Sequence, residues 1–267
     1  MSDLRVTLVQ NDTAWHDAAA NRARIEASLA GEEGRTDLVI LPETFTTGFS
    51  NAAVETAEGM DGPSVAWMKA AARRFDAAFT GSIQIRDGEG VFNRLLFVTP
   101  DGAVKVYDKR HLFRMAREQE WYRAGKGRLV VEWRGWRVCP LVCYDLRFPV
   151  FSRNRTEPSR GPDALEYDLL LYVANWPAPR HEAWRTLLRA RAIENLCYVA
   201  GVNRAGTDGN GHPYLGGSCL VDPLGRDLVE CGAAPAVEGA ACSRERLEEH
   251  RRRFPAHRDG DRFTLSE

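Results

Sequence analysis

The sequence predicts a single α/β domain in which helices cover β-sheets. Short apolar runs alternate with helical patterns in the first half of the chain and again over residues 169–203, which is typical of helices packed on a sheet. Hairpins are interspersed, and they argue against a purely parallel barrel. The length allows one large domain or two small ones. We assign residues 1–267 to one domain, with a C-terminal helix and tail from about residue 243.

In the first half, strands are predicted where apolar residues cluster, and helices where apolar residues recur at helical spacing. Ala18, Ile25 and Leu29 give the first helix one apolar face, and Pro42 stops the second strand. A turn at residues 100–102 (Pro-Asp-Gly) joins two hairpin strands. The predicted elements are residues 4–10 (strand), 14–30 (helix), 37–41 (strand), 64–75 (helix), and 78–85, 91–99 and 103–107 (strands).

The second half begins with a polar, irregular stretch at residues 109–127, which predicts a long loop. Long loops inside compact domains are often functional. Residues 154–164 are the most loop-like segment but are too short for a domain linker. The predicted elements are residues 129–133 and 136–142 (strands), 149–155 (short helix), 169–174 (strand), 181–195 (helix), 198–203, 218–222 and 227–230 (strands), and 243–253 (charged helix).

The composition argues against several classes of protein. The 36 Lys and Arg residues balance 37 Asp and Glu residues, so the chain has no general attraction to nucleic acid or acidic membranes. Its apolar runs are shorter than the roughly 18 residues of a membrane helix, and its start lacks a secretory signal pattern, so we expect a cytoplasmic protein. Six cysteines without a Cys-x-x-Cys pair disfavour a disulfide scaffold, a structural zinc site and a thioredoxin-type redox pair.

Three reactive side chains each follow a predicted strand. Glu43 comes after an apolar run in LPETF, Lys109 ends a hairpin strand, and Cys143 ends a strand in LVCYD. Strand ends that open into loops are where α/β proteins build sites. A thiol can attack a carbonyl, a carboxylate can take its proton, and an ammonium can stabilise the developing negative charge. A convergent Cys–Glu–Lys set would therefore suit acyl transfer.

Other interpretations of these residues remain open. Each of the three can instead be a packed or solvated side chain, and an unassigned cysteine after a strand is more often a buried thiol. His111, His181 and His212 offer a competing scheme in which an imidazole activates the cysteine. Trp176 follows a strand in ANWP and is a candidate pocket residue. The chain contains no HExxH motif and no glycine-rich phosphate loop.

Several ordered motifs carry a resemblance to a known family. LPETF, YDKRHLF and LVCYDLRFP, followed by ANWP at 174–177, RARAIEN at 189–195 and GGS at 216–218, resemble the carbon–nitrogen hydrolase (nitrilase) superfamily. The resemblance runs from Leu4 to about residue 231. ANWP and the HLF after the lysine are most similar to the omega-amidase branch. The resemblance implies a four-layer α-β-β-α sandwich, assembly into homodimers or larger homo-oligomers, and no metal or organic cofactor.

The resemblance also implies roles for the three strand-end residues. Cys143 would be the nucleophile, Glu43 the general base and Lys109 the cation that stabilises the intermediate. The backbone N–H of Tyr144 would help to form the oxyanion hole.

A second glutamate is usual in the loop after the lysine, seven residues before a glycine. Glu118 precedes Gly125 by seven residues and fits this spacing, and Glu120 is its close rival. The second glutamate would orient Lys109 or the substrate amide.

The implied reaction releases ammonia from the terminal amide of a short dicarboxylate monoamide, such as 2-oxoglutaramate or succinamate, through a thioester. The distal carboxylate of such a substrate needs a cationic partner, for which Arg147 and Arg114 are the candidates. Phe45, Phe148 and Trp176 would form the walls of a small pocket.

Three alternatives remain beside this interpretation. Within the superfamily, the protein could be a nitrilase or an N-carbamoyl amino acid amidohydrolase. It could also be an inactive interaction protein with the same fold, although all the motif residues are present. A redox thiol protein is disfavoured, because the nearest cysteine, Cys139, lies four residues before Cys143 along the same predicted strand.

Overall fold

The computed structural model describes residues 2–88, 90–161, 163–261 and 263–265. Over these residues, two six-stranded sheets and one short hairpin form. The strands of the first sheet are β1 (Leu4–Gln10), β2 (Leu38–Ile40), β3 (Ala78–Asp87), β4 (Gly90–Val98), β5 (Val104–Asp108) and β14 (Ala236–Cys242). Their spatial order is β14-β1-β2-β3-β4-β5.

The second sheet has the order β13-β12-β9-β8-β7-β6. Its strands are β6 (Val131–Trp133), β7 (Trp136–Val142), β8 (Leu169–Ala174), β9 (Tyr198–Asn203), β12 (Cys219–Val221) and β13 (Asp227–Glu230). The hairpin joins β10 (Ala205–Thr207) to β11 (Pro213–Leu215).

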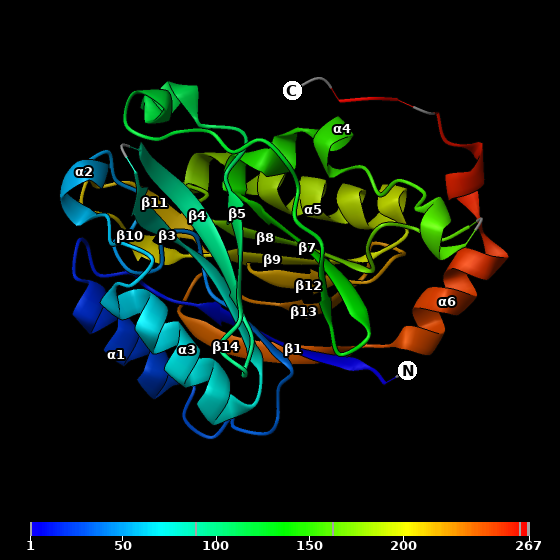
Figure 1. Cartoon of the computed structure of the whole chain (residues 1–267), viewed down its shortest axis with the longest axis horizontal. Helices are drawn as coiled ribbons and strands as arrows, with labels where there is room; N and C mark the ends of the chain where they lie inside the picture. The colour runs from blue at the N-terminus through cyan, green and yellow to red at the C-terminus, as the bar shows by residue number, and fades with distance from the viewer. Residues whose placement is uncertain (1, 89, 162, 262, 266–267) are drawn as a thin grey trace.

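Helices cover the outer faces of both sheets (Figure 1). Helices α1 (Ala18–Ser28) and α3 (Pro63–Phe75) cover the first sheet, and α5 (His181–Asn195) covers the second. The remaining helices are the short α2 (Ala53–Thr56) and α4 (Pro149–Ser152) and the charged α6 (Arg244–Arg253). The four-layer α-β-β-α prediction is confirmed.

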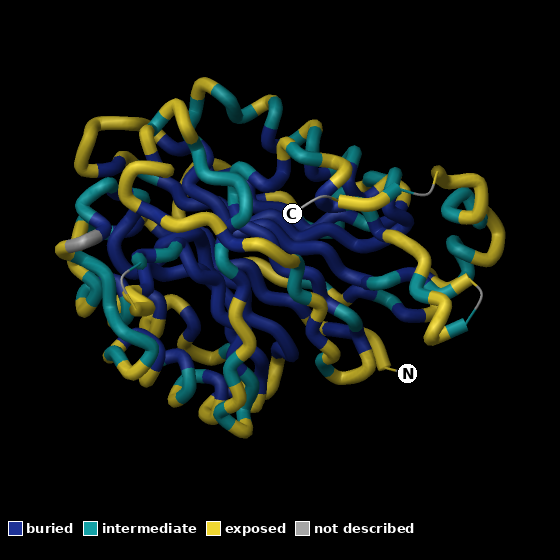
Figure 2. The backbone as a smooth tube through the Cα atoms, turned by 45° about the horizontal axis from the view of Figure 1, so that its top comes forward, coloured by how far each residue is buried: buried dark blue, intermediate teal, exposed yellow. Residues whose placement is uncertain are grey.

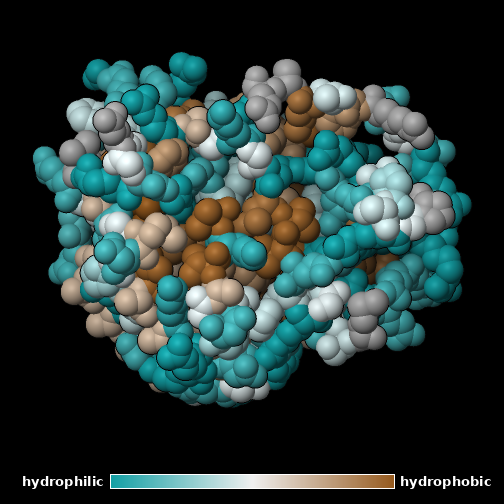
Figure 3. Space-filling view, viewed as in Figure 1, coloured by the Kyte–Doolittle hydropathy of each residue, from teal (hydrophilic) through white to brown (hydrophobic). Residues whose placement is uncertain are grey.

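Strand β2 shows how sequence alternation builds two cores. Leu38 and Ile40 point into the core between the sheets, whereas Val39 points into the core beneath α1 and α3. Because successive strand residues face opposite sides, three apolar residues in a row serve both cores. The buried strands accordingly form the centre of the molecule (Figure 2). On the face seen in Figure 3, hydrophilic side chains surround a central apolar area.

Strand direction brings the functional loops to shared sheet edges. β1, β2 and β3 run parallel, as do β7, β8 and β9. β5 pairs antiparallel with β4, which itself pairs antiparallel with β3, so β5 runs in the same direction as β2. Loops after β2 and β5 therefore leave the first sheet at the same edge, where α/β proteins place their sites.

The structure corrects some predicted elements. Helix α1 begins at Ala18 rather than at residue 14, because the Asp17 side chain caps it by accepting from the Ala20 N–H at 2.9 Å. Strand β14 and the β10–β11 hairpin were not predicted. Among the described residues, none of the helices has the length and apolar character needed to cross a membrane.

Candidate active site

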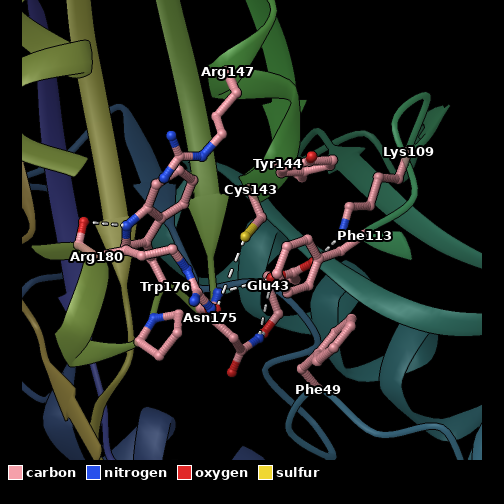
Figure 4. A pocket seen from close by; sticks show the side chains of 11 residues that line it. Glu43, Phe49, Lys109, Phe113, Cys143, Tyr144, Arg147, Asn175, Trp176 and Arg180 are labelled. Carbon is pink, nitrogen blue, oxygen red and sulfur yellow. Dashed lines mark hydrogen bonds and ion pairs between the residues drawn. The ribbon is translucent and has the colours of Figure 1, made fainter. Parts of the chain in front are cut away.

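Glu43, Lys109 and Cys143 come from three strand ends and meet at one cavity. Glu43 lies just beyond β2, Lys109 directly follows β5, and Cys143 directly follows β7. All three line one small cavity. Figure 4 shows the sulfur, the carboxylate and the amine directed toward one another. The two sheets therefore contribute jointly to the site: the carboxylate and the amine come from the first sheet, and the thiol from the second.

The Lys109 ammonium lies between two carboxylates. Its Nζ donates to Glu43 Oε1 at 2.9 Å and to the two Glu118 oxygens at 3.1 and 3.0 Å. Glu118 is fully buried, whereas Glu120 is exposed and pairs with Arg117 at 2.7 Å. Of the two candidate glutamates, Glu118 is the one beside Lys109.

Neutral donors fix both carboxylates. Glu43 Oε1 accepts from the Asn93 side chain at 2.7 Å, and its Oε2 accepts from the Asn175 backbone N–H at 2.7 Å. The Asn175 side chain also donates to the Glu43 carbonyl at 2.7 Å. Glu118 Oε2 accepts from the Phe113 N–H at 2.6 Å. Buried charges need such partners, and here each one restricts a carboxylate to one orientation.

Gly125 lies where the loop that carries Glu118 returns to Lys109. The loop that begins at Lys109 returns to it, because the Gly125 N–H donates to the Lys109 carbonyl at 2.9 Å. A Cβ on Gly125 would lie 2.0 Å from the Asp108 carbonyl oxygen, closer than any side chain permits. Glycine thus closes the loop that carries Glu118 back to Lys109.

Cys143 lies at a strained bend. Its φ of 44° is in the left-handed region, which non-glycine residues adopt at a cost of about 1–3 kcal/mol. The bend turns the chain sharply after β7, and Sγ lies 3.9 Å from the Asn175 carbonyl oxygen. Such strain is often found where a nucleophile must be presented to a cavity.

The charges in the site determine its resting protonation. Burial raises the pKa of the Cys143 thiol well above its usual value, the Glu43 carboxylate raises it further, and Lys109 opposes both. Burial lowers the pKa of Lys109, but Glu118 and then Glu43 outweigh it and hold that pKa well above normal. The resting site therefore contains a neutral thiol beside a permanent ammonium.

Burial also acts on the second glutamate. It raises the pKa of Glu118 above its usual value, and the Lys109 ammonium opposes this rise. The ion pair with Lys109 is thus what favours the charged form of Glu118.

Aromatic and cationic side chains form the walls of the cavity. Arg147 and Arg180 line it, with Arg147 Cζ 5.0 Å from the Trp176 ring and Arg180 Cζ 5.3 Å from the Phe113 ring. Within the described part of the chain, neither guanidinium pairs with a carboxylate. Two unpaired guanidinium groups on aromatic walls provide a place for an anionic ligand.

Three residues predicted at the pocket lie outside the cavity lining. Phe45 is fully buried in the core beneath α3, where its ring packs 5.9 Å from that of Trp67. Phe148 does not line the cavity, and its ring stacks on that of His111 at 3.8 Å between centroids. Arg114 is exposed in the loop after Lys109 and does not line the cavity.

The histidines of the competing scheme also lie elsewhere. His111 Nδ1 contacts Asp145 at 2.7 Å, His181 is the first residue of α5, and His212 lines a neighbouring outer pocket. None of the three lines the cavity that contains Cys143. Within the described ranges, these three histidines are therefore not placed to activate Cys143.

Sequence reasoning missed several residues of the site, among them Asn175, Asn93 and Arg180. Asn175 directly follows β8, so the strand-end rule that selected Cys143 could have selected it too. Asn93 lies inside β4, where no local signal separates it from an ordinary strand residue. Arg180 lies in the turn before α5, and only the fold places it at the cavity.

The described residues contain no group of three or more His, Cys, Asp or Glu side chains arranged to hold a metal ion. All six cysteines lie among them and are free thiols.

Comparison with known proteins gives a consistent result. Residues 5–252 match the carbon–nitrogen hydrolase family model. The chain is 48% identical over 266 residues to the omega-amidase YafV of Escherichia coli K12, covering 99% of this chain and 100% of that one. It is 31% identical over 257 residues to a 2-oxoglutaramate amidase of Bacillus subtilis, covering 95% and 96% of the two chains.

Solved structures show the same relationship. A carbon–nitrogen hydrolase superfamily protein of Xanthomonas campestris, with an arsenic adduct in its active site, is 57% identical, covers 100% of both chains and has a TM-score of 0.98. A Nesterenkonia amidase with acrylamide added at its active-site cysteine is 26% identical, with 96% and 99% of the chains covered and a TM-score of 0.78. The chain described here belongs to the carbon–nitrogen hydrolase family.

Proposed function

We propose that this protein is a cysteine-dependent omega-amidase. It releases ammonia from the terminal amide of a short dicarboxylate monoamide of the 2-oxoglutaramate type, through a thioester. The observation that carries the proposal is the cavity itself, where Cys143, Glu43 and Lys109 face two unpaired arginines. The names of the related omega-amidase and 2-oxoglutaramate amidase support the same substrate class.

Acylation begins when Glu43 takes the thiol proton as Cys143 Sγ attacks the amide carbon. The carbonyl oxygen becomes an oxyanion, which the Lys109 ammonium and the backbone N–H of Tyr144 stabilise. Glu43 then returns its proton to the amide nitrogen as the C–N bond breaks. Ammonia leaves, and the acyl group remains on sulfur as a thioester.

Deacylation uses the same groups in turn. Glu43 takes a proton from a water molecule while the water oxygen attacks the thioester carbon. Lys109 again stabilises the oxyanion. The C–S bond breaks, the proton on Glu43 returns to Cys143, and the carboxylic acid leaves. One carboxylate thus acts as base and acid in both halves of the reaction.

Glu118 supports the reaction through Lys109. A lysine this deeply buried would lose its proton without nearby negative charge. The contacts from both Glu118 oxygens hold the ammonium charged and directed at the cavity. Glu118 also keeps its own position through the Phe113 N–H.

We expect the side chains that form the cavity walls to select the substrate. We assign Arg147 and Arg180 to the distal carboxylate, because both guanidinium groups line the cavity without an internal partner. The cavity is small and bordered by aromatic rings, which suits a substrate of a few carbons. The rings of Trp176 and Phe113 support the guanidinium groups from behind.

The test is ammonia release from a substrate panel, with Cys143→Ala as the control. The panel contains 2-oxoglutaramate, succinamate, butyramide, a short nitrile and an N-carbamoyl amino acid. We expect the two anionic amides to be cleaved best and Cys143→Ala to be folded and inactive. Preference for the nitrile or the N-carbamoyl compound would overturn the substrate class, and an active Cys143→Ala protein would overturn the nucleophile.

A separate measurement addresses the inactive-protein alternative. A thiol-reactive amide analogue should label Cys143, which lines the cavity, rather than the other five cysteines, which are buried. Absence of both labelling and ammonia release from every compound would favour an interaction protein that retains only the fold.

A further inference from the structure

We propose that Asp145 is a positioning residue. It holds the segment of residues 107–111, which carries Lys109, at a fixed distance from the bend at Cys143. Asp145 is fully buried and does not line the cavity, so it cannot touch substrate. The inference rests on the proposed function, because that reaction needs the ammonium and the sulfur on either side of one carbonyl group.

On one side, Asp145 closes the turn that contains the nucleophile. Its Oδ2 accepts from the Val142 backbone N–H at 3.0 Å, and its own carbonyl accepts from the Phe148 N–H at 3.0 Å. These contacts lie before and after Cys143 in the chain. They stabilise the left-handed conformation that Cys143 would not adopt by itself.

On the other side, the same carboxylate holds the residues that flank Lys109. The Tyr107 hydroxyl donates to Asp145 Oδ2 at 2.8 Å and accepts from the Arg110 N–H at 3.2 Å. Oδ1 accepts from the His111 backbone N–H at 3.0 Å and contacts His111 Nδ1 at 2.7 Å. Lys109 is therefore fixed from both ends of its short segment.

The carboxylate thereby links the two sheets at the point where the reaction takes place. Tyr107 belongs to β5 at the edge of the first sheet, and Asp145 follows β7 of the second. Burial, and then the Asp145 charge, raise the pKa of Tyr107 well above normal, so its hydroxyl remains a donor. His111 is held against the same unit by stacking on Phe148.

The contact pattern requires a carboxylate rather than an amide. Each oxygen receives one backbone N–H, from His111 on Oδ1 and from Val142 on Oδ2. A backbone N–H only donates, so an asparagine in either orientation would direct its NH₂ at one of them. The Asp145→Asn protein would leave that buried donor without an acceptor and shift one side of the link.

The experiment compares the full-length wild type with Asp145→Asn. We expect kcat for ammonia release from 2-oxoglutaramate to fall about 10–100-fold, because a displacement near 1 Å can cost about this much. KM should stay within about threefold, because the substitution replaces none of the residues that line the cavity. Alkylation of Cys143 by iodoacetamide should fall clearly less than kcat, because that reaction needs no oxyanion stabilisation by Lys109.

Asp168→Asn is the matched control. Asp168 is also a buried carboxylate, and it pairs with Arg137, Arg244 and Arg251 away from the cavity. Its substitution should lower the melting temperature and leave kcat of the folded protein unchanged. Where Asp145→Asn does not fold, Tyr107→Phe removes one donor to the carboxylate and should lower kcat several-fold with KM unchanged.

The outcomes separate this inference from the proposed function. A wild type that cleaves no amide overturns the proposed function. A wild type that cleaves amides, with kcat unchanged in Asp145→Asn or in Tyr107→Phe, overturns the positioning role. Equal losses of kcat and of the alkylation rate also overturn it, since they would indicate general loss of the site rather than displacement of Lys109.

Discussion

Lys109 and Glu118 form an ion pair in which both side chains are shielded from solvent. Their side chains are 1% and 0% exposed, and Nζ contacts Oε1 at 3.1 Å and Oε2 at 3.0 Å. Glu43 contacts the same Nζ, so two carboxylates share one ammonium. Removing the charge of Glu118 would leave Glu43 as the remaining carboxylate partner of a buried ammonium, so the ammonium would be held less firmly.

The first prediction concerns the Glu118→Gln protein. The amide keeps the shape of the side chain and can still accept from the Phe113 N–H, but it withdraws the largest favourable charge on Lys109. We expect kcat for ammonia release to fall about 100-fold, as when one oxyanion-stabilising group is lost. The melting temperature should also fall.

The neighbouring glutamate provides the control. Glu120 is exposed and pairs only with Arg117 at the surface, where ion pairs contribute little. Glu120→Gln should therefore have wild-type kcat and melting temperature. Similar losses in the two proteins, or wild-type kcat in Glu118→Gln, would contradict the role given to Glu118.

A second prediction concerns Glu43 as the shared acid and base. Glu43→Gln can keep the contact from Asn93 but cannot take a proton, so both halves of the reaction slow. General base catalysis contributes about 10²–10⁴-fold, and we expect kcat to fall within that range. Ammonia release measures the effect of the substitution on activity, and thermal unfolding measures its effect on stability. Activity within threefold of wild type would exclude Glu43 as the base.

Much of the site could be predicted because its chemistry lies at strand ends. Glu43 and Cys143 each come after an apolar run, and Lys109 ends a hairpin strand, so all three could be located from the residues alone. Parallel strands then bring such ends to shared edges without further information. The family resemblance supplied the remaining step, which is that ends from two different sheets face one cavity.

Phe45 shows where local reasoning fails. It lies two residues after Glu43 and is one of the three aromatic residues predicted to form the pocket walls. Thr44 has a φ of 42°, and this left-handed residue breaks the regular alternation of side chains. The Phe45 ring consequently enters the core beneath α3 instead of the cavity.

Strand β14 could not be predicted for a different reason. Its sequence, AVEGAAC, is rich in alanine and glycine, and most of its residues are partly or fully exposed. Its extended form comes from antiparallel pairing with β1, whose partner residues lie more than 200 positions earlier. Strand formation here depends on tertiary context rather than on local propensity.

A third prediction separates the two arginines of the cavity from Arg114. A charge-assisted hydrogen bond contributes about 1.5–3 kcal/mol, so Arg180→Met and Arg147→Met should each lower kcat/KM for succinamate about 10–100-fold. Butyramide lacks the distal carboxylate, and its kcat/KM should change less than threefold. Arg114→Met, outside the cavity lining, should match wild type on both amides. Parallel losses on succinamate and butyramide would contradict carboxylate recognition.

The fourth prediction starts from a buried carboxylate far from the chemistry. Asp168 is 1% exposed and lies 2.7 Å from Arg137, 2.7 Å from Arg251 and 3.2 Å from Arg244. Burial alone would raise the pKa of Asp168, but Arg137, Arg251 and Arg244 outweigh it and hold that pKa far below normal. The folded state therefore binds the Asp168 proton more weakly than the unfolded chain does.

This difference in proton binding sets the direction in which folding stability changes with pH. The stabilisation from Asp168 is fully present above its unfolded pKa of about 3.9 and is lost as pH falls toward the folded value. The free energy of unfolding, measured with urea, should be higher for the wild type than for Asp168→Asn. The difference should be constant between pH 7 and 5 and should shrink below about pH 4. Asp163→Asn, which breaks an exposed pair with Arg258, should follow wild type throughout. A margin that grows on acidification would contradict the sign, because it would mean that folding raises the pKa of Asp168.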